Sequence, residues 1–133
     1  MTGVVLDTHA VVWHLLDSPK LPASVLSLMD RAVRNGDPMY VATVSVLETT
    51  YRVEKGRLPS AAFDRLVQTL SDPESDIVSV SFDMAIALAA RRIPREQVPD
   101  MPDRIIAATA VHLGVPLITR DRRIQQAGIE TIW

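Results

Sequence analysis

Five acidic residues of this 133-residue chain stand where they could act together, although they lie far apart in the sequence. They are Asp7, Glu48, Asp100, Asp103 and Asp121. Asp7 and Asp121 come just after short apolar runs, whereas Glu48 and Asp103 lie near the start of segments with helical spacing. A parallel sheet could gather such positions, because ligands bind beyond the carboxyl ends of its strands.

The chemistry expected of such a group is set by its oxygen ligands. The chain has no cysteine, which excludes a thiolate zinc site and a cysteine nucleophile. A cluster of carboxylates suits a hard cation such as Mg²⁺ or Mn²⁺, and it needs a cation or protons to offset its own repulsion. Because such a cation can activate water and stabilise charge on a phosphoryl oxygen, the cluster predicts phosphodiester hydrolysis.

Each acid, taken singly, is equally compatible with a structural role. Asp7 and Asp103 could cap helices, as we expect of Asp83, which stands in a similar position without another acid nearby in sequence. Glu48 is harder to explain in this way, because its neighbours are largely apolar and an unpaired carboxylate there is costly. It is the joint placement of the acids that favours a functional site.

The three histidines offer no alternative constellation. His9 and His14 are five residues apart, which is poor spacing for a shared metal on a helix, and His112 stands alone. We interpret His14 and His112 as structural and leave His9 open, because it is two residues from Asp7. No glycine-rich phosphate loop or G-x-S-x-G turn occurs either.

The elements that must position these residues alternate between short apolar runs and amphipathic segments. Strands are expected at 3–6, 39–43, 77–80, 115–119 and 129–133, and helices at 10–16, 23–33, 46–56, 61–70, 84–93 and 104–113. We expect Ser60, Asp83 and Asp103 to cap helices. This alternation predicts one α/β domain over residues 1–133, with a parallel sheet of about four to five strands flanked by helices.

Four segments, in this order, carry a resemblance to a known family. They are Val4–Ala10 (VVLDTHA), Glu48 with Val53–Leu58 (VEKGRL), Asp100–Ala110 (DMPDRIIAATA) and Leu117–Asp121 (LITRD). Together they resemble PIN-domain ribonucleases, in particular the toxins of VapBC-type toxin–antitoxin pairs. The resemblance covers nearly the whole chain and implies a PIN-like fold with an acidic metal site at one end of the sheet.

The resemblance also implies roles for individual residues. Asp7, Glu48, Asp103 and Asp121 would be the catalytic and metal-binding acids, with one or two Mg²⁺ ions (or Mn²⁺) positioning a phosphate for in-line attack by water. Thr8 and Thr119 would give nearby polar support. Asp100 ranks below the other acids, because Met101-Pro102 departs from the family's usual pattern beside it.

Arginines near the acidic motifs are candidates for contact with RNA, since a guanidinium makes two parallel hydrogen bonds to phosphate. We single out Arg104, Arg120, Arg122 and Arg123. For the last three, contact with an acidic partner segment is an equal alternative.

The function implied is that of an endoribonuclease toxin of a type II toxin–antitoxin system, acting on tRNA or rRNA. A VapB-type antitoxin would inhibit it, and the chain would form a homodimer. The alternative from another class is a PIN-like module that binds RNA or a partner without catalysis. A third, a structure-specific DNA nuclease, would need large extra segments.

Composition is compatible with this expectation. No apolar run is long enough to span a membrane and no secretion signal is evident, so we expect a cytoplasmic protein. The net charge of −2 at first argues against nucleic acid. Without the five acids assigned to one pocket, however, eleven acids face fourteen basic residues, a balance of +3.

Overall fold

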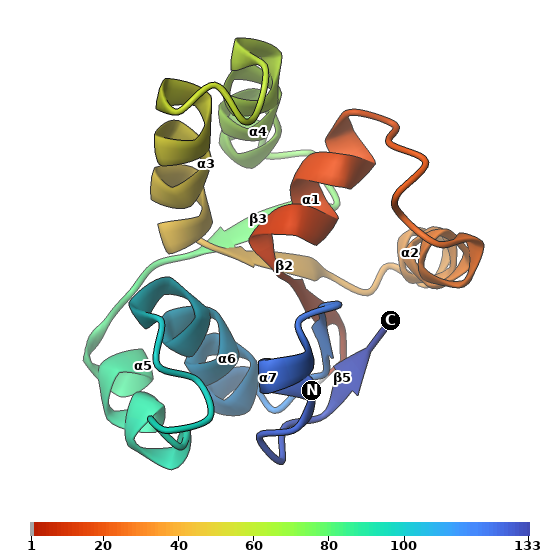
Figure 1. The fold of residues 1–133 in the computed structure, drawn as a ribbon. Coiled ribbons are helices and arrows are strands. Elements are labelled where there is room, and N and C mark those ends of the chain that lie inside the picture. Colours follow the sequence, from red (N-terminus) through yellow and green to blue (C-terminus); the bar gives the residue numbers. More distant parts are fainter. Residues whose placement is uncertain (1) are drawn as a thin grey trace.

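The computed structural model describes residues 2–133 and contains a five-stranded sheet in which all neighbouring strands are parallel (Figure 1). The strand order is β3-β2-β1-β4-β5. The strands are β1 (Val4–Leu6), β2 (Met39–Ala42), β3 (Ile77–Val80), β4 (Leu117–Ile118) and β5 (Thr131–Ile132). The predicted fold class is thereby confirmed, and β1 lies at the centre of the sheet.

Helices connect the strands and cover both faces of the sheet (Figure 1). They are α1 (Thr8–Leu15), α2 (Ala23–Asn35), α3 (Val44–Glu54), α4 (Ser60–Ser71), α5 (Met84–Ala89), a 3₁₀ turn (Ala90–Arg92), α6 (Met101–Leu113) and α7 (Arg122–Gln125). None of the helices within residues 2–133 has the length and apolar character needed to cross a membrane.

Alternation along β1 divides the core into two layers. Val4 and Leu6 face a cluster that includes Val11 of α1 and Leu66 of α4, while Val5 faces the opposite cluster with α5, α6 and α7. All three strand residues are buried, which is typical of a central parallel strand covered on both faces. Packing on both faces of the sheet therefore fixes the position of the end of β1, and Asp7 is the residue that follows it.

Several helix ends match the sequence patterns. Gly36 and Gly114 end α2 and α6 in the left-handed conformation that glycine adopts without strain. Asp83 caps α5, accepting a hydrogen bond from the Ile86 amide at 3.0 Å. The expected structural role of Asp83 is thus confirmed.

Other predicted helix ends were wrong. Ser60 does not cap α4, because Pro59 holds that position and no side chain accepts a capping hydrogen bond. Asp103 does not cap α6 either: the helix begins at Met101, and Asp100 accepts a hydrogen bond from the Asp103 amide at 3.1 Å. The short helix α7 was not predicted.

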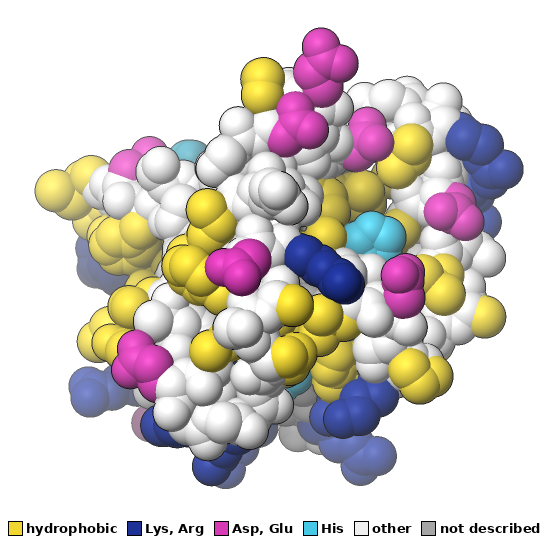
Figure 2. All heavy atoms as spheres, turned by 90° about the horizontal axis from the view of Figure 1, so that it is seen from above, with side chains coloured by type: hydrophobic (Ala, Val, Ile, Leu, Met, Phe, Trp, Pro, Cys, Tyr) yellow, Lys and Arg dark blue, Asp and Glu magenta, His cyan; other side chains and the backbone are white. Residues whose placement is uncertain are grey.

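Hydrophobic side chains are exposed among acidic and basic ones on the face seen in Figure 2. In the whole described chain, the most exposed large ones are Met84 and Met101, followed by Leu88, Tyr51 and Phe82. Along α2 and α4, by contrast, the apolar residues Val25, Met29, Ala62 and Leu66 are buried in the core.

Candidate active site

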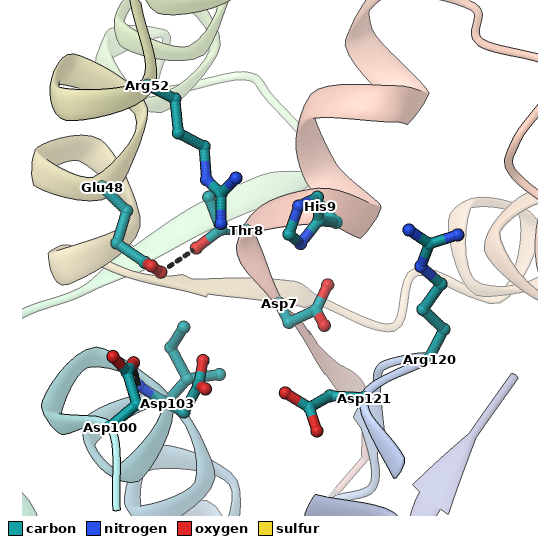
Figure 3. Close-up of a pocket in the computed structure, with 10 residues that line it drawn as sticks. Asp7, Thr8, His9, Glu48, Arg52, Asp100, Asp103, Arg120 and Asp121 are labelled. Carbon is teal, nitrogen blue, oxygen red and sulfur yellow. Dashed lines mark hydrogen bonds between the residues drawn. The ribbon is translucent and has the colours of Figure 1, made fainter. Parts of the chain in front are cut away.

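The five acids meet in one pocket of about 280 Å³. Asp7, Glu48, Asp100, Asp103 and Asp121 all line it, and they come from the segments after β1 and β4, from the N-terminal half of α3 and from the start of α6 (Figure 3). The pocket lies beyond the carboxyl ends of the parallel strands, where the sequence predicted it.

Asp7 is the most deeply placed of these acids. It follows β1 directly and caps α1, accepting a hydrogen bond from the Ala10 amide at 2.8 Å. Burial raises its pKa to about 6, with smaller contributions from the negative charges of Glu48 and Asp121, while hydrogen bonds from Thr119 and Ala10 act in the opposite direction. Asp7 therefore combines a structural cap with a carboxyl group whose charge is poorly compensated.

Glu48, Asp100 and Asp103 form the tightest group. One carboxylate oxygen from each lies within 4.8 Å of the others. The Thr8 hydroxyl donates to Glu48 Oε1 at 2.6 Å and is also hydrogen-bonded to Ser45 Oγ at 2.8 Å, which fixes the direction of the Glu48 side chain (Figure 3). Burial raises the pKa of Asp103 to about 7, and the charges of Asp100, Asp121, Glu48 and Asp7 add to this rise.

Asp121 closes the pocket from the β4 side. Its amide donates to Thr119 Oγ1 at 3.0 Å, and its Oδ1 accepts from the Arg123 and Ile124 amides at 2.8 and 3.4 Å, which caps α7. Since Thr119 also hydrogen-bonds Asp7, one buried threonine connects the two acids. Thr8 and Thr119 thus lie where the expected polar support would be.

His9, left open from the sequence, lines the same pocket. Its pKa is lowered to about 4, chiefly because the ring is partly buried and then because of the positive charges of Arg52, Arg120 and Lys20. Figure 3 shows Arg52 and Arg120 on opposite sides of His9. The imidazole is consequently neutral at pH 7.

Arg52 was missed by the sequence analysis, although a signal was available: it lies one helical turn after Glu48 and so on the same face of α3. Arg120, which was predicted, does line the pocket.

Arg104, Arg122 and Arg123 do not line the acidic pocket. Arg104 points elsewhere: its guanidinium donates to the carbonyls of Ala90 and Ile93 at 2.8 and 3.2 Å. It ties α6 to the 3₁₀ turn and so has a structural role outside the acidic pocket. Arg122 and Arg123 are exposed on α7.

The donor set fits a divalent cation. The pocket holds carboxylates from four separate elements, and one oxygen each of Glu48, Asp100 and Asp103, from α3 and α6, lie close enough to share one ion. Burial chiefly, and then the neighbouring negative charges, raise the pKa values of Asp7 and Asp103, so both carboxyl groups are costly to ionise without a cation. A hard cation bound by these oxygens would offset that cost.

Comparison with known proteins agrees with this geometry. The family model described as "PIN domain" matches residues 4–130. The chain belongs to the PIN-domain family. This PIN domain is 28% identical over 125 residues to Ribonuclease VapC22 of Mycobacterium tuberculosis, covering 94% of this chain and 92% of that protein.

Solved structures share the fold of this PIN domain. They include VapBC2 from Rickettsia felis bound to a promoter DNA fragment, with a TM-score of 0.72, 16% identity and coverage of 98% of this chain and 97% of that one. DNA-bound VapBC from Salmonella typhimurium gives a TM-score of 0.72, 19% identity and coverage of 99% and 98%.

Proposed function

We propose that this PIN domain is a metal-dependent endoribonuclease and the toxin of a type II toxin–antitoxin pair, inhibited by a VapB-type antitoxin. The observation that carries the proposal is the convergence of Asp7, Glu48, Asp103 and Asp121, with Asp100, in one pocket. The similarity to a ribonuclease over nearly the full length supports the same activity. RNA is the proposed substrate, met in the cytoplasm.

Asp7, Glu48, Asp103 and Asp121 would hold the ion, which we propose to be Mg²⁺, with Mn²⁺ as a substitute. When bound, the ion supplies Lewis-acid stabilisation of charge on the phosphoryl oxygens and makes water a better nucleophile. Asp100 would add charge to the Glu48–Asp103 side, since its carboxylate belongs to the same close group.

The protein's own side chains orient the acids and the attacking water. Thr8 orients Glu48, and Thr119 orients Asp7, so both acids keep their directions before substrate binds. Asp121 uses Oδ1 to cap α7, which leaves its other carboxylate oxygen to hold the ion, either directly or through the attacking water. Water then attacks the phosphorus in line: its oxygen bonds to phosphorus while the opposite bond from phosphorus to the sugar oxygen breaks. The water releases one proton to solvent, and the leaving sugar oxygen takes up a proton from solvent.

The partners are proposed from the relatives. Two of the similar structures are VapBC complexes, so we propose that an antitoxin of the VapB type binds this chain and closes its pocket. We also propose that the chain forms a homodimer, which light scattering on the purified protein would detect. Sequencing the RNA ends that appear after induction in cells would test whether tRNA or rRNA is cut.

The test of the activity uses the purified chain, freed from any antitoxin, with total cellular RNA. Cleavage should occur with Mg²⁺, stop with EDTA and return when Mg²⁺ is added in excess. Binding of RNA without cleavage under these conditions would instead identify a module that only binds RNA. Cleavage that persists in EDTA would contradict the proposal that the activity depends on a metal ion.

A further inference from the structure

A second pocket, of about 170 Å³, opens beside the acidic one. The two pockets share Thr8, His9, Arg52 and Arg120 in their walls, so they are continuous around His9. Their charges are nevertheless opposite. Lys20, Arg52, Arg57 and Arg120 line the second pocket, and no carboxylate of the described residues does.

Local structure holds these cations in place. The Arg120 guanidinium carbon lies 4.6 Å from the centre of the Trp13 ring, and Lys20 Nζ lies 5.6 Å from it. Trp13 is itself fixed, because it is only 6% exposed. Lys20 and Arg120 therefore both lie over one buried indole, and these cation–π contacts order the two side chains before any ligand binds.

The other two cations are brought together by the end of α3. Gly56 adopts a left-handed conformation with φ of +72°, and the Arg57 amide donates to the Arg52 carbonyl at 2.8 Å. This turn brings the chain back at Arg57, so that both arginines reach the same pocket. The pocket thus has cations from the α1–α2 segment, from the end of α3 and from the β4–α7 loop.

We propose that this basic pocket, formed by Lys20, Arg52, Arg57 and Arg120, binds a phosphate of the RNA strand that neighbours the phosphate being cut. The inference rests on the proposed function, since it takes the acidic pocket as the place of cleavage. A strand with one phosphate at the carboxylates must continue along the surface, and the basic pocket is continuous with that point.

The pocket suits one small anionic group, and its continuity with the acidic pocket favours a phosphodiester of the strand being cut over an acidic peptide. Its volume is well below the several hundred Å³ typical of sites for drug-sized ligands, and so suits one small anionic group. Arginine suits phosphate through paired hydrogen bonds, and a basic groove that follows the backbone is how single-stranded nucleic acids are held without reading sequence. Binding there would also offset the charge penalty of bringing RNA to five acids.

Arg57 is the residue to change, because it lines the basic pocket and not the acidic one. The matched control is Arg34→Gln, which removes an exposed arginine at the end of α2 that lines neither pocket. The probe is a fluorescein-labelled random-sequence single-stranded RNA, with binding followed by anisotropy in EDTA over a range of NaCl concentrations. Cleavage kinetics in Mg²⁺ and thermal melts are recorded on the same proteins.

Loss of one phosphate contact should reduce the slope of log K against log salt by about 0.7 in Arg57→Gln. It should also raise KM severalfold with kcat unchanged, because the contact is made equally in the ground and transition states. Arg34→Gln should match the wild type in both measurements, and all three proteins should melt alike.

Two results would overturn the inference while leaving the proposed function intact. One is RNA cleavage with the same salt slope and KM in Arg57→Gln as in the wild type. The other is normal RNA binding by Arg57→Gln together with weakened antitoxin binding, which would assign the pocket to an acidic partner segment. A wild-type protein that neither binds nor cuts RNA would overturn the proposed function itself, and this inference with it.

Discussion

At the scale of single residues, the most informative property is the raised pKa of two buried acids. Asp7 and Asp103 have pKa values of about 6 and 7, above the 3.8 of a free aspartate, mainly because they are withdrawn from solvent among other carboxylates. A chain selected only for stability would gain by replacing such groups. Buried carboxyl groups such as these two are expected where a folded protein binds a cation.

The two acids make the stability of the metal-free protein depend on pH. Both bind protons more tightly in the folded state than in the unfolded state, whereas His9, whose pKa is lowered to about 4, binds its proton less tightly there. The shifts of the two acids together exceed that of His9, so the free energy of unfolding should fall as pH rises from about 4 to about 7. Asp103→Asn should reduce this fall and, at pH 8 in EDTA, raise Tm by roughly 3–5 °C, on the order of 1 kcal/mol after solvent screening is considered.

The measurement is thermal unfolding of the wild type and Asp103→Asn in EDTA between pH 4 and 8, repeated in Mg²⁺. Mg²⁺ should stabilise the wild type most at high pH, and the variant less. A wild type whose stability rises across this range in EDTA would contradict the electrostatics described for the pocket.

At the scale of elements, the order of strands and helices could be predicted because buried apolar runs alternate with amphipathic segments. The residue that caps α6 could not be predicted in this way. Asp100 and Asp103 are both good capping residues, and the choice depends on where the preceding loop leaves the chain. The four-residue helix α7 is too short to show any periodicity, and its cap, Asp121, had been assigned to the site alone.

The site was predictable where residues directly follow strands and less so where packing brings them together. Asp7 and Asp121 follow β1 and β4, and neighbouring parallel strands place their ends side by side. Lys20 and Arg57 reach the basic pocket through the α1–α2 segment and the turn after α3, and no local pattern indicates this. Arg104 was expected to contact RNA because of its place in the motif, and in the structure its guanidinium binds backbone carbonyls.

The structural role of Arg104 is testable. Arg104→Met should lower the free energy of unfolding by about 2 kcal/mol, because the hydrogen bonds to the Ala90 and Ile93 carbonyls are lost. RNA cleavage measured well below Tm should remain near the wild-type rate. Urea unfolding gives the first quantity; unchanged stability with lost cleavage would restore Arg104 as an RNA contact.

At the scale of the whole molecule, the net charge of −2 conceals a separation of charge. Five acids are concentrated in one pocket and four cations in the pocket that continues from it. The remaining acids and basic residues leave a balance of +3, so the surface outside the acidic pocket is mildly basic. A bound cation would make the acidic pocket itself compatible with RNA.

The central claim is that the acids serve catalysis and not only helix capping, and two matched variants separate these roles. Asp7 and Asp83 both cap helices by accepting a backbone hydrogen bond, and asparagine can accept the same bond. They differ in that Asp7 lines the acidic pocket and Asp83 does not.

The decisive measurement is the rate of Mg²⁺-dependent cleavage of end-labelled RNA by the wild type, Asp7→Asn and Asp83→Asn, each shown to be folded by circular dichroism. We predict that Asp7→Asn loses cleavage by at least about 100-fold, because one negatively charged oxygen ligand is removed from the ion. Asp83→Asn should cleave at the wild-type rate. Wild-type cleavage by folded Asp7→Asn would contradict the account.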